Sequence, residues 1–261
     1  MSSKFSTFIC QNCGSETSQY FGRCVNCNEW NTIVEEKRNS RSKTTNINKS
    51  KKSKLLNEIE IDKISRFTSG FKEFDRVLGG GIVPGSIVLL GGEPGIGKST
   101  IVLQSAGKIS LNEKVLYITA EESLEQVKIR WERLNQNSLD LKIFAETNLS
   151  LIIEEIKKIK PSFAIIDSIQ AINNDEMESS PGSVSQVRTC SSELQNLAKE
   201  NNIALLIIGH VTKDGALAGP KTLEHLVDVV LNFEGDNIAS VSYTHLRAHE
   251  TGRNVVCRLL L

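Results

Sequence analysis

The chain has 261 residues, which is enough for one full α/β core and a small additional module. Its 31 basic and 31 acidic residues balance to zero net charge, so no overall field attracts a polyanion and any basic patch must be local. No apolar run approaches the length of a membrane span, and the first residues lack the apolar core of a signal peptide. We therefore expect a cytoplasmic protein without a membrane partner.

Residues 1–36 contain two C-x-x-C pairs, Cys10 with Cys13 and Cys24 with Cys27, separated by ten residues. Each pair places two thiolates on one metal ion, and two pairs complete a tetrahedral sulfur site with no open position. The pattern predicts a small zinc ribbon in which Zn²⁺ is structural and supplies most of the folding free energy. An iron centre and an extracellular knot of two disulfides are the alternatives.

Residues 37–55 are predicted to be a flexible linker. From Lys37 to Lys54 the sequence has eight basic residues, no acidic residue and a single aliphatic side chain, so it cannot bury a core. The segment is either a solvated spacer or an arm that tethers nucleic acid.

Residues 56–239 are predicted to form a second domain, organised around a phosphate loop. The apolar run 87–90 leads into a glycine-rich turn that fits the phosphate-loop template, and a helical pattern follows. The glycines allow the backbone to approach a phosphate, Lys98 can reach the β- and γ-phosphates, and the Ser99 hydroxyl can bind Mg²⁺. A glycine-rich turn with one exposed lysine is the alternative. The predicted ATP-binding residues are Gly92, Glu93, Pro94, Gly95, Ile96, Gly97, Lys98, Ser99 and Thr100.

Strand and helix patterns alternate along this domain, which predicts an α/β fold with a mostly parallel sheet covered by helices on both faces. Ligands are then expected at the carboxyl ends of the strands. The predicted helices are 71–78, 98–110, 122–134, 150–160 and 184–201. Besides the strand before the phosphate loop, the predicted strands are 114–119, 142–145, 163–167, 203–209 and 227–232, and polar loops are predicted at 173–183 and 212–221.

Three acidic residues follow predicted strands and are candidates for the chemistry of ATP hydrolysis. Asp167 ends an apolar strand, as expected for the carboxylate that holds the Mg²⁺ shell, although it could instead cap a helix. Glu121 and Glu122 end the strand after the phosphate-loop helix, and two adjacent carboxylates cannot both point inward. We predict that Glu121 activates the attacking water; the alternative is that both residues simply open the next helix.

Four residues near the polar loops are candidates for sensing nucleotide or contacting DNA. His210 follows a predicted strand and could sense the nucleotide state, or serve as a capping or core histidine. Arg188, Lys213 and Lys221 lie on or beside the two loops at the same end of the sheet. They could contact a phosphate backbone or be solvated.

Taken together, these residues resemble the bacterial RadA (Sms) family of DNA repair proteins. The resemblance runs from about Phe8 to Asp236, with the cysteine module and the ATPase motifs in the family's order. Beyond the cysteines and the phosphate loop, the matching segments are 117–123, 165–168, 180–188, 209–213, 218–221 and 223–228. A clock-type regulatory ATPase of the RecA fold shares the phosphate loop, but the cysteine module and residues 211–213 count against it.

The resemblance implies a RecA-like P-loop ATPase core, a homo-hexameric ring and single-stranded DNA in its channel. It also implies ATP-driven branch migration of branched recombination intermediates together with RecA recombinase. Carried over by position, Lys98 and Ser99 bind the nucleotide and Mg²⁺, and Glu121 matches the catalytic glutamate. The loops at 173–188 and 212–222 match the DNA-facing loops.

The C-terminal segment departs from the family pattern. After Asp236 the family continues its sheet and carries a Lys-Asn-Arg-Phe-Gly motif and a Lon-protease-like domain, whereas residues 240–261 resemble neither. We expect a truncated chain with an artefactual or disordered tail. Because the missing motif is implicated in ATPase coupling, an ATP- and DNA-binding module without motor activity is the alternative function.

Overall fold

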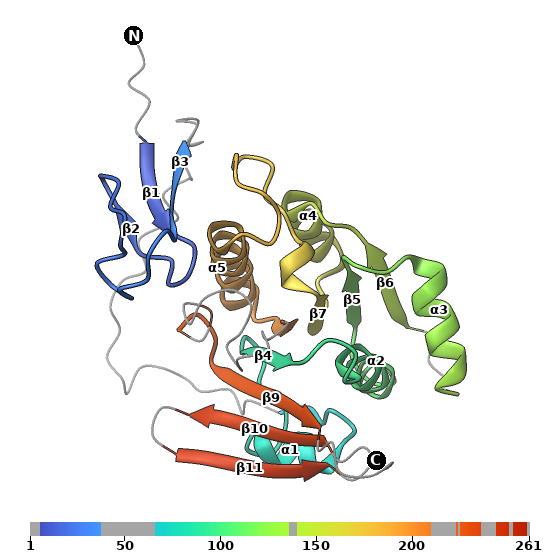
Figure 1. Ribbon diagram of the computed structural model, residues 1–261. Coiled ribbons are helices and arrows are strands. Elements are labelled where there is room, and N and C mark those ends of the chain that lie inside the picture. Colours follow the sequence, from blue (N-terminus) through green and yellow to red (C-terminus); the bar gives the residue numbers. More distant parts are fainter. Residues whose placement is uncertain are drawn as a thin grey trace, which may run out of the picture.

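A computed structural model of the chain shows two parts, an N-terminal ribbon and a larger main domain (Figure 1). We use "ribbon" for residues 6–37 and "main domain" for the described residues from 66 onward. The structure describes residues 6–37, 66–135, 140–209, 223, 225–235, 244–250 and 253–259.

The ribbon is a three-stranded antiparallel sheet built around sulfur rather than hydrocarbon. Strands β1 (Ser6–Cys10), β2 (Glu16–Thr17) and β3 (Ile33–Lys37) lie in the order β2-β1-β3. Its core cluster consists of Cys10, Cys24 and Ile33, with Phe8 and the other two cysteines of the pairs packed against them, and Ile9 is also buried. So small an apolar core cannot stabilise the ribbon by itself.

The main domain is an eight-stranded sheet in the order β11-β10-β9-β4-β8-β7-β5-β6. The six strands from β9 to β6 are parallel, as the alternation of strands and helices predicts. Their bounds are β4 (Ile87–Gly92), β5 (Val115–Thr119), β6 (Leu141–Ala145), β7 (Phe163–Asp167), β8 (Ala204–Ile208) and β9 (Val229–Gly235).

An antiparallel hairpin extends this sheet beyond β9. It consists of β10 (Thr244–Glu250) and β11 (Arg253–Leu259), and β10 pairs with β9. Both strands lie within the segment 240–261 that the sequence separates from the family pattern. The domain boundaries predicted from the sequence stay a prediction.

Helices cover both faces of the sheet. Helices α1 (Lys72–Val77), α2 (Lys98–Ile109) and α3 (Leu124–Arg133) pack on one face, and α4 (Leu149–Ile159) and α5 (Val184–Asn201) pack on the other. A short 3₁₀ turn, η2 (Ile169–Ala171), follows β7. Figure 1 shows α4 and α5 together above the sheet and α2 with α3 on its other side.

The core divides into two layers because side chains alternate along each buried strand. In β4, Val88 and Leu90 pack toward α2, whereas Ile87 and Leu89 pack toward α5. Each aliphatic side chain buried in this way contributes about 1.5–3 kcal/mol relative to an exposed position. Continuous apolar runs of this kind are typical of parallel strands covered on both faces.

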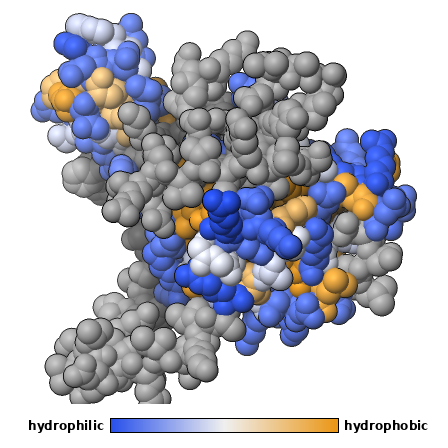
Figure 2. Space-filling view, turned by 90° about the horizontal axis from the view of Figure 1, so that it is seen from below, coloured by the Kyte–Doolittle hydropathy of each residue, from blue (hydrophilic) through white to orange (hydrophobic). Residues whose placement is uncertain are grey.

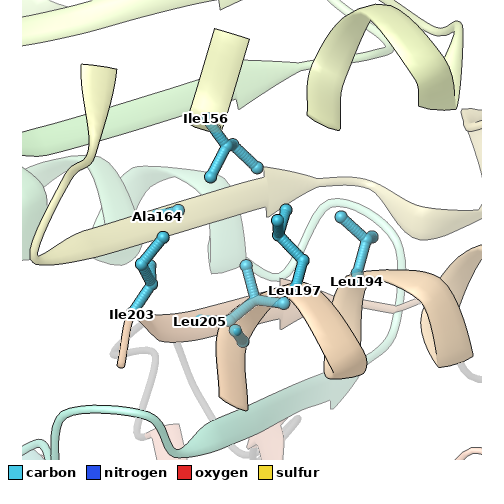
Figure 3. A pocket seen from close by; sticks show the side chains of 7 residues that line it. Ile156, Ala164, Leu194, Leu197, Ile203 and Leu205 are labelled. Carbon is cyan, nitrogen blue, oxygen red and sulfur yellow. The ribbon is translucent and has the colours of Figure 1, made fainter. Parts of the chain in front are cut away.

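The layer beneath α4 and α5 contains a small apolar pocket. It is lined by seven aliphatic side chains, Ile156, Ala164, Leu194, Leu197, Ala198, Ile203 and Leu205. Figure 3 shows this pocket from close by. No polar side chain lines it, so this pocket cannot hold a nucleotide; it is a gap in the packing of the core.

Local capping explains where two helices begin. Ser123 accepts a hydrogen bond from the Gln126 amide, and the Gln126 side chain accepts one from the Ser123 amide, so α3 begins at Leu124 rather than at the predicted residue 122. Asn148 caps α4 through the amides of Ser150 and Leu151, so that helix begins at Leu149.

On the face shown in Figure 2, the described apolar residues gather in small patches between hydrophilic ones. No helix among the residues that the structure describes combines the length and the apolar character that crossing a membrane requires.

Candidate metal centre and nucleotide site

The four predicted metal ligands of the ribbon come together. One sulfur atom from each of Cys10, Cys13, Cys24 and Cys27 lies within 4.8 Å of the others. The Cys10 and Cys27 sulfurs are 3.6 Å apart, and those of Cys13 and Cys24 are 3.5 Å apart. A tetrahedral Zn²⁺ with bonds of about 2.3 Å separates its sulfurs by about 3.8 Å, whereas a disulfide needs about 2.05 Å. The arrangement therefore fits a structural metal ion and excludes disulfides between these pairs.

Hydrogen bonds around the sulfurs favour thiolates. Cys24 Sγ accepts from the Asn26 amide at 3.4 Å and lies 3.2 Å from Ser15 Oγ, while Asn26 Nδ2 donates to Cys13 Sγ at 3.6 Å. Burial raises the pKa of Cys24, but hydrogen bonds from the Cys27 amide, the Ser15 hydroxyl and the Asn26 amide outweigh burial and lower the pKa to about 6. Burial raises the pKa of Cys27 to about 11. Because metal ligands must be deprotonated, a bound cation would supply the attraction that Cys27 lacks.

The phosphate loop joins the end of β4 to the start of α2, as predicted. Gly92, Gly95 and Gly97 adopt φ angles of +156°, +79° and +105°, which residues with a Cβ rarely adopt. At Gly92 a Cβ would also lie 2.6 Å from the carbonyl oxygen of Phe233 on β9. The tip of the loop, Glu93 to Gly95, is exposed. The loop thus combines a tightly packed base with an open tip at the positive end of α2.

The Lys98 side chain folds back onto the phosphate loop. Its ammonium donates to the carbonyl oxygens of Gly92 at 2.7 Å and Glu93 at 2.8 Å, and the residue is 4% exposed. Burial lowers its pKa, while the charges of Asp167 and Glu121 act in the opposite direction. The ammonium thus lies between the loop and both predicted catalytic carboxylates.

Asp167 ends β7 and faces the start of α2. Its carboxylate accepts a hydrogen bond from the hydroxyl of Tyr117, and the hydroxyl of Ser99 lies close enough to lower its pKa. Burial raises the pKa of Asp167, and both hydroxyls oppose that rise. A hydroxyl and a carboxylate side by side are the oxygen donors that Mg²⁺ prefers, so these two residues fit the predicted magnesium site.

The two adjacent glutamates after β5 have different partners. Glu121 accepts a hydrogen bond from the hydroxyl of Ser168, the residue after Asp167. Glu122 instead forms an ion pair with Arg130 on α3. The neighbouring carboxylates therefore diverge, and Glu121 is the one placed beside the end of β7.

Sequence reasoning missed two residues of this site. Tyr117 is fully buried and donates to Asp167, and Arg130 holds Glu122 on α3. The signal for Tyr117 was present: a residue with a hydroxyl stands in a strand that otherwise needs only apolar side chains, and buried hydroxyls have partners. Nothing in the local sequence relates Arg130 to Glu122 rather than to solvent.

The loop after η2 is fastened to α5 by a buried glutamine. Gln186 donates to the carbonyl oxygens of Asn174 at 3.1 Å and Ser179 at 2.9 Å, and it accepts from the Asn174 amide at 2.9 Å. The predicted polar loop at 173–183 is therefore tied to α5 near its start, at Asn174, and in its middle, at Ser179.

Arg188, a predicted DNA contact, lies on α5 and is engaged by the ribbon. Its guanidinium donates to the Gly14 carbonyl oxygen at 3.1 Å and lies 3.6 Å from a carboxylate oxygen of Glu16. Figure 1 shows the ribbon beside α5. The other predicted contacts, Lys213 and Lys221, and the candidate sensor His210 lie outside the described residues.

Comparison with known proteins agrees with this arrangement. The AAA domain family matches residues 51–216. The chain belongs to this family. A second family, described as a rubredoxin metal binding domain, matches residues 8–35, which include all four clustered cysteines.

Curated relatives of the chain confirm the resemblance to the RadA family that the sequence motifs indicate. The chain is 49% identical to DNA repair protein RadA of Listeria monocytogenes over 88% of its length, and 46% identical to the protein of that name from Haemophilus influenzae over 93%. These alignments cover 51% and 54% of the two relatives, so the chain spans about half the length of the curated relatives it matches.

Solved structures confirm the RecA-like fold. An ATPase domain of known structure superposes with a TM-score of 0.61 at 17% identity, covering 76% of this chain and 88% of that one. A KaiC-like protein from Pyrococcus horikoshii superposes with a TM-score of 0.55 at 20% identity, covering 75% and 93%.

Proposed function

We propose that this chain carries the ATP-hydrolysing part of a DNA-dependent ATPase of homologous recombination and repair. One observation carries the proposal: Lys98, Asp167 and Glu121 converge from α2, β7 and β5 at one edge of a parallel sheet. Charge of both signs beside a phosphate loop suits the hydrolysis of a nucleotide triphosphate. The relatives named for DNA repair support the choice of process.

In the proposed mechanism, the loop amides and Lys98 hold the β- and γ-phosphates. Ammonium and phosphate oxygens attract strongly in a site with little water, so Lys98 leaves the carbonyls of Gly92 and Glu93 for ATP. Ser99 and Asp167 would hold Mg²⁺, which would neutralise charge on the β- and γ-phosphate oxygens.

Glu121 orients the water that attacks the γ-phosphorus. As the bond between the γ-phosphorus and the bridging oxygen breaks, ADP leaves and the Glu121 carboxylate accepts a proton from the water. Ser168 holds this carboxylate from β7, and the Arg130 pair keeps Glu122 away from the same place. The two glutamates therefore do not compete for the water.

Single-stranded and branched DNA are the proposed partners, with RecA recombinase and a homo-hexameric ring as in the family. Arg188, Lys213, Lys221 and the basic segment 37–54 supply positive charge for a phosphate backbone. Arg188 can contact DNA only after its guanidinium leaves Gly14 and Glu16 of the ribbon.

Phosphate release by the purified chain, with and without single-stranded DNA, tests the proposal. We expect DNA to stimulate hydrolysis and Lys98→Ala to abolish it. Glu121→Gln should retain ATP binding but lower turnover at least about 100-fold, because it removes the proton acceptor. Glu122→Gln is the matched control and should retain most of the activity. A chain that binds neither ATP nor DNA refutes the proposal.

An ATP- and DNA-binding module without turnover is the second candidate function. This candidate predicts that ATP and DNA bind while phosphate release stays at background with or without DNA.

For the ribbon we propose a structural Zn²⁺ held by its four cysteines. The sulfur spacing and the hydrogen bonds to sulfur support a four-coordinate ion with no open position. Elemental analysis of protein purified without chelator should find one zinc per chain. Iron in place of zinc, or no metal, would contradict the assignment.

A further inference from the structure

We propose that Tyr117 is a positioning residue for the magnesium site, whose hydroxyl holds the Asp167 carboxylate in the orientation that meets Ser99. The inference rests on the proposed function, because it concerns the same ATP site. It adds a residue from a third strand to the loop and the carboxylates already described.

The geometry of the sheet makes this contact possible. On neighbouring strands, Thr119 lies opposite Asp167, and Tyr117 lies two residues earlier on the same face. Two residues of strand correspond to about 6.6 Å. A tyrosine side chain spans this distance and still ends in a hydrogen-bond donor, whereas serine or threonine at the same position would be too short.

The hydroxyl is not needed to fill the core. The ring of Tyr117 belongs to the core layer that also contains Val102, Leu103 and Val127, and a phenylalanine would occupy nearly the same volume. A buried hydroxyl without a partner destabilises the fold, so its presence requires a specific acceptor. The Asp167 carboxylate is that acceptor.

The hydrogen bond from Tyr117 orients Asp167, the carboxylate that is expected to hold Mg²⁺. Asp167 is 7% exposed, its carboxylate accepts a hydrogen bond from the Tyr117 hydroxyl on β5, and Ser99 at the start of α2 lies near enough to lower its pKa. Partners of this kind orient metal-binding groups, and removing them typically lowers metal affinity about 10- to 100-fold.

Nucleotide binding, measured against the Mg²⁺ concentration, tests this role without relying on turnover. With a fluorescent, non-hydrolysable ATP analogue, Tyr117→Phe should leave the affinity in EDTA unchanged. It should raise the Mg²⁺ concentration for half-maximal tightening of binding by about tenfold. Tyr20→Phe removes the same hydroxyl from an exposed position on the ribbon and should match the wild type.

A double-mutant cycle separates positioning from mere stability. In the Asp167→Asn background, Tyr117→Phe should change the Mg²⁺ requirement little, because the group it orients has lost its charge. Equal Mg²⁺ requirements of Tyr117→Phe and wild type overturn the inference, even if the variant melts at lower temperature. So does an undiminished effect of Tyr117→Phe in the Asp167→Asn background. Failure of the wild type to bind the analogue in Mg²⁺ refutes the proposed function instead.

If Tyr117→Phe does not fold, an NMR measurement on the wild-type chain tests the role of Tyr117 instead. With tyrosine labelled by ¹³C at Cζ, addition of Mg²⁺ and the ATP analogue should shift the Tyr117 resonance and leave that of Tyr20 in place. Asp167→Asn should abolish the Mg²⁺-dependent part of the shift. A Tyr117 resonance that does not respond to Mg²⁺ in the wild type overturns the inference.

Discussion

The ribbon and the main domain are both built on β-sheets, yet different interactions hold them together. The ribbon buries two cysteines and two isoleucines among its hydrophobic residues and leaves Tyr20, Val25 and Trp30 more than half exposed. The main domain buries aliphatic side chains in two layers on either side of a parallel sheet. Metal ligation can replace a hydrocarbon core only in a small module, because a larger one buries enough apolar area unaided.

We expect the largest effect from removal of the metal, which should unfold the ribbon and leave the main domain folded. A strong chelator, or Cys24→Ser, should unfold the ribbon completely, because structural zinc contributes about 10 kcal/mol or more to modules of this size. ATP binding by the main domain should persist. Amide NMR spectra should lose the ribbon resonances and retain those of the main domain; loss of both sets would contradict the comparison.

Thiol labelling gives an internal control for this experiment. At pH 8 the four ribbon cysteines should react after chelation, whereas Cys190 should not. Cys190 is fully buried in the core, and burial raises its pKa to about 12, so its thiolate is scarce at pH 8. Its reaction in native protein would contradict the described core.

The next largest effect tests the hydrocarbon core of the main domain. Leu194→Ala enlarges the pocket between α4 and α5 and should lower the free energy of unfolding by about 2–5 kcal/mol, measured by urea titration. Leu151→Ala is the matched control, because that side chain lies on the exposed side of α4, and it should cost less than about 1 kcal/mol. Equal losses at the two positions would refute the packing described.

A third prediction concerns the base of the phosphate loop. Gly92→Ala places a Cβ 2.6 Å from the Phe233 carbonyl oxygen at a φ of +156°, so either β9 or the loop must move. We expect a destabilisation of about 1–3 kcal/mol and loss of ATP binding, measured by thermal unfolding and calorimetry. Retention of wild-type ATP affinity would show that ATP binding does not need the close contact between Gly92 and the Phe233 carbonyl oxygen.

The smallest effect concerns the contact between the two parts. The Arg188 and Glu16 side chains are 45% and 39% exposed, so their ion pair should contribute no more than about 1 kcal/mol. Glu16→Ala should leave the melting temperature of the main domain unchanged. It should tighten single-stranded DNA binding by up to about fivefold, because it releases Arg188.

The Arg188→Ala background gives the control for that prediction. There Glu16→Ala should have no effect on DNA affinity, because the residue it releases is gone. Weaker DNA binding by Glu16→Ala in the otherwise wild-type chain would indicate that the ribbon assists DNA binding rather than competing for Arg188.

Much of this molecule was predictable because its decisive signals are local. The cysteine pairs, the glycines of the phosphate loop and the apolar runs each report on a few consecutive residues. Strand β7 and helix α5 match the predicted ranges 163–167 and 184–201. Such signals are reliable because a metal, a phosphate and a covered sheet each demand particular residue types at fixed spacing.

Tertiary structure alone decided how residues from separate elements combine. The sequence predicts Glu121 as the catalytic residue but gives no partner for either glutamate, and only the approach of β7 and α3 assigns one to Ser168 and the other to Arg130. It likewise presents Arg188 as a free basic residue, although the folded chain places Gly14 and Glu16 against it. The physical reason is that spacing along the chain determines which face a side chain occupies, whereas its partner depends on which elements pack together.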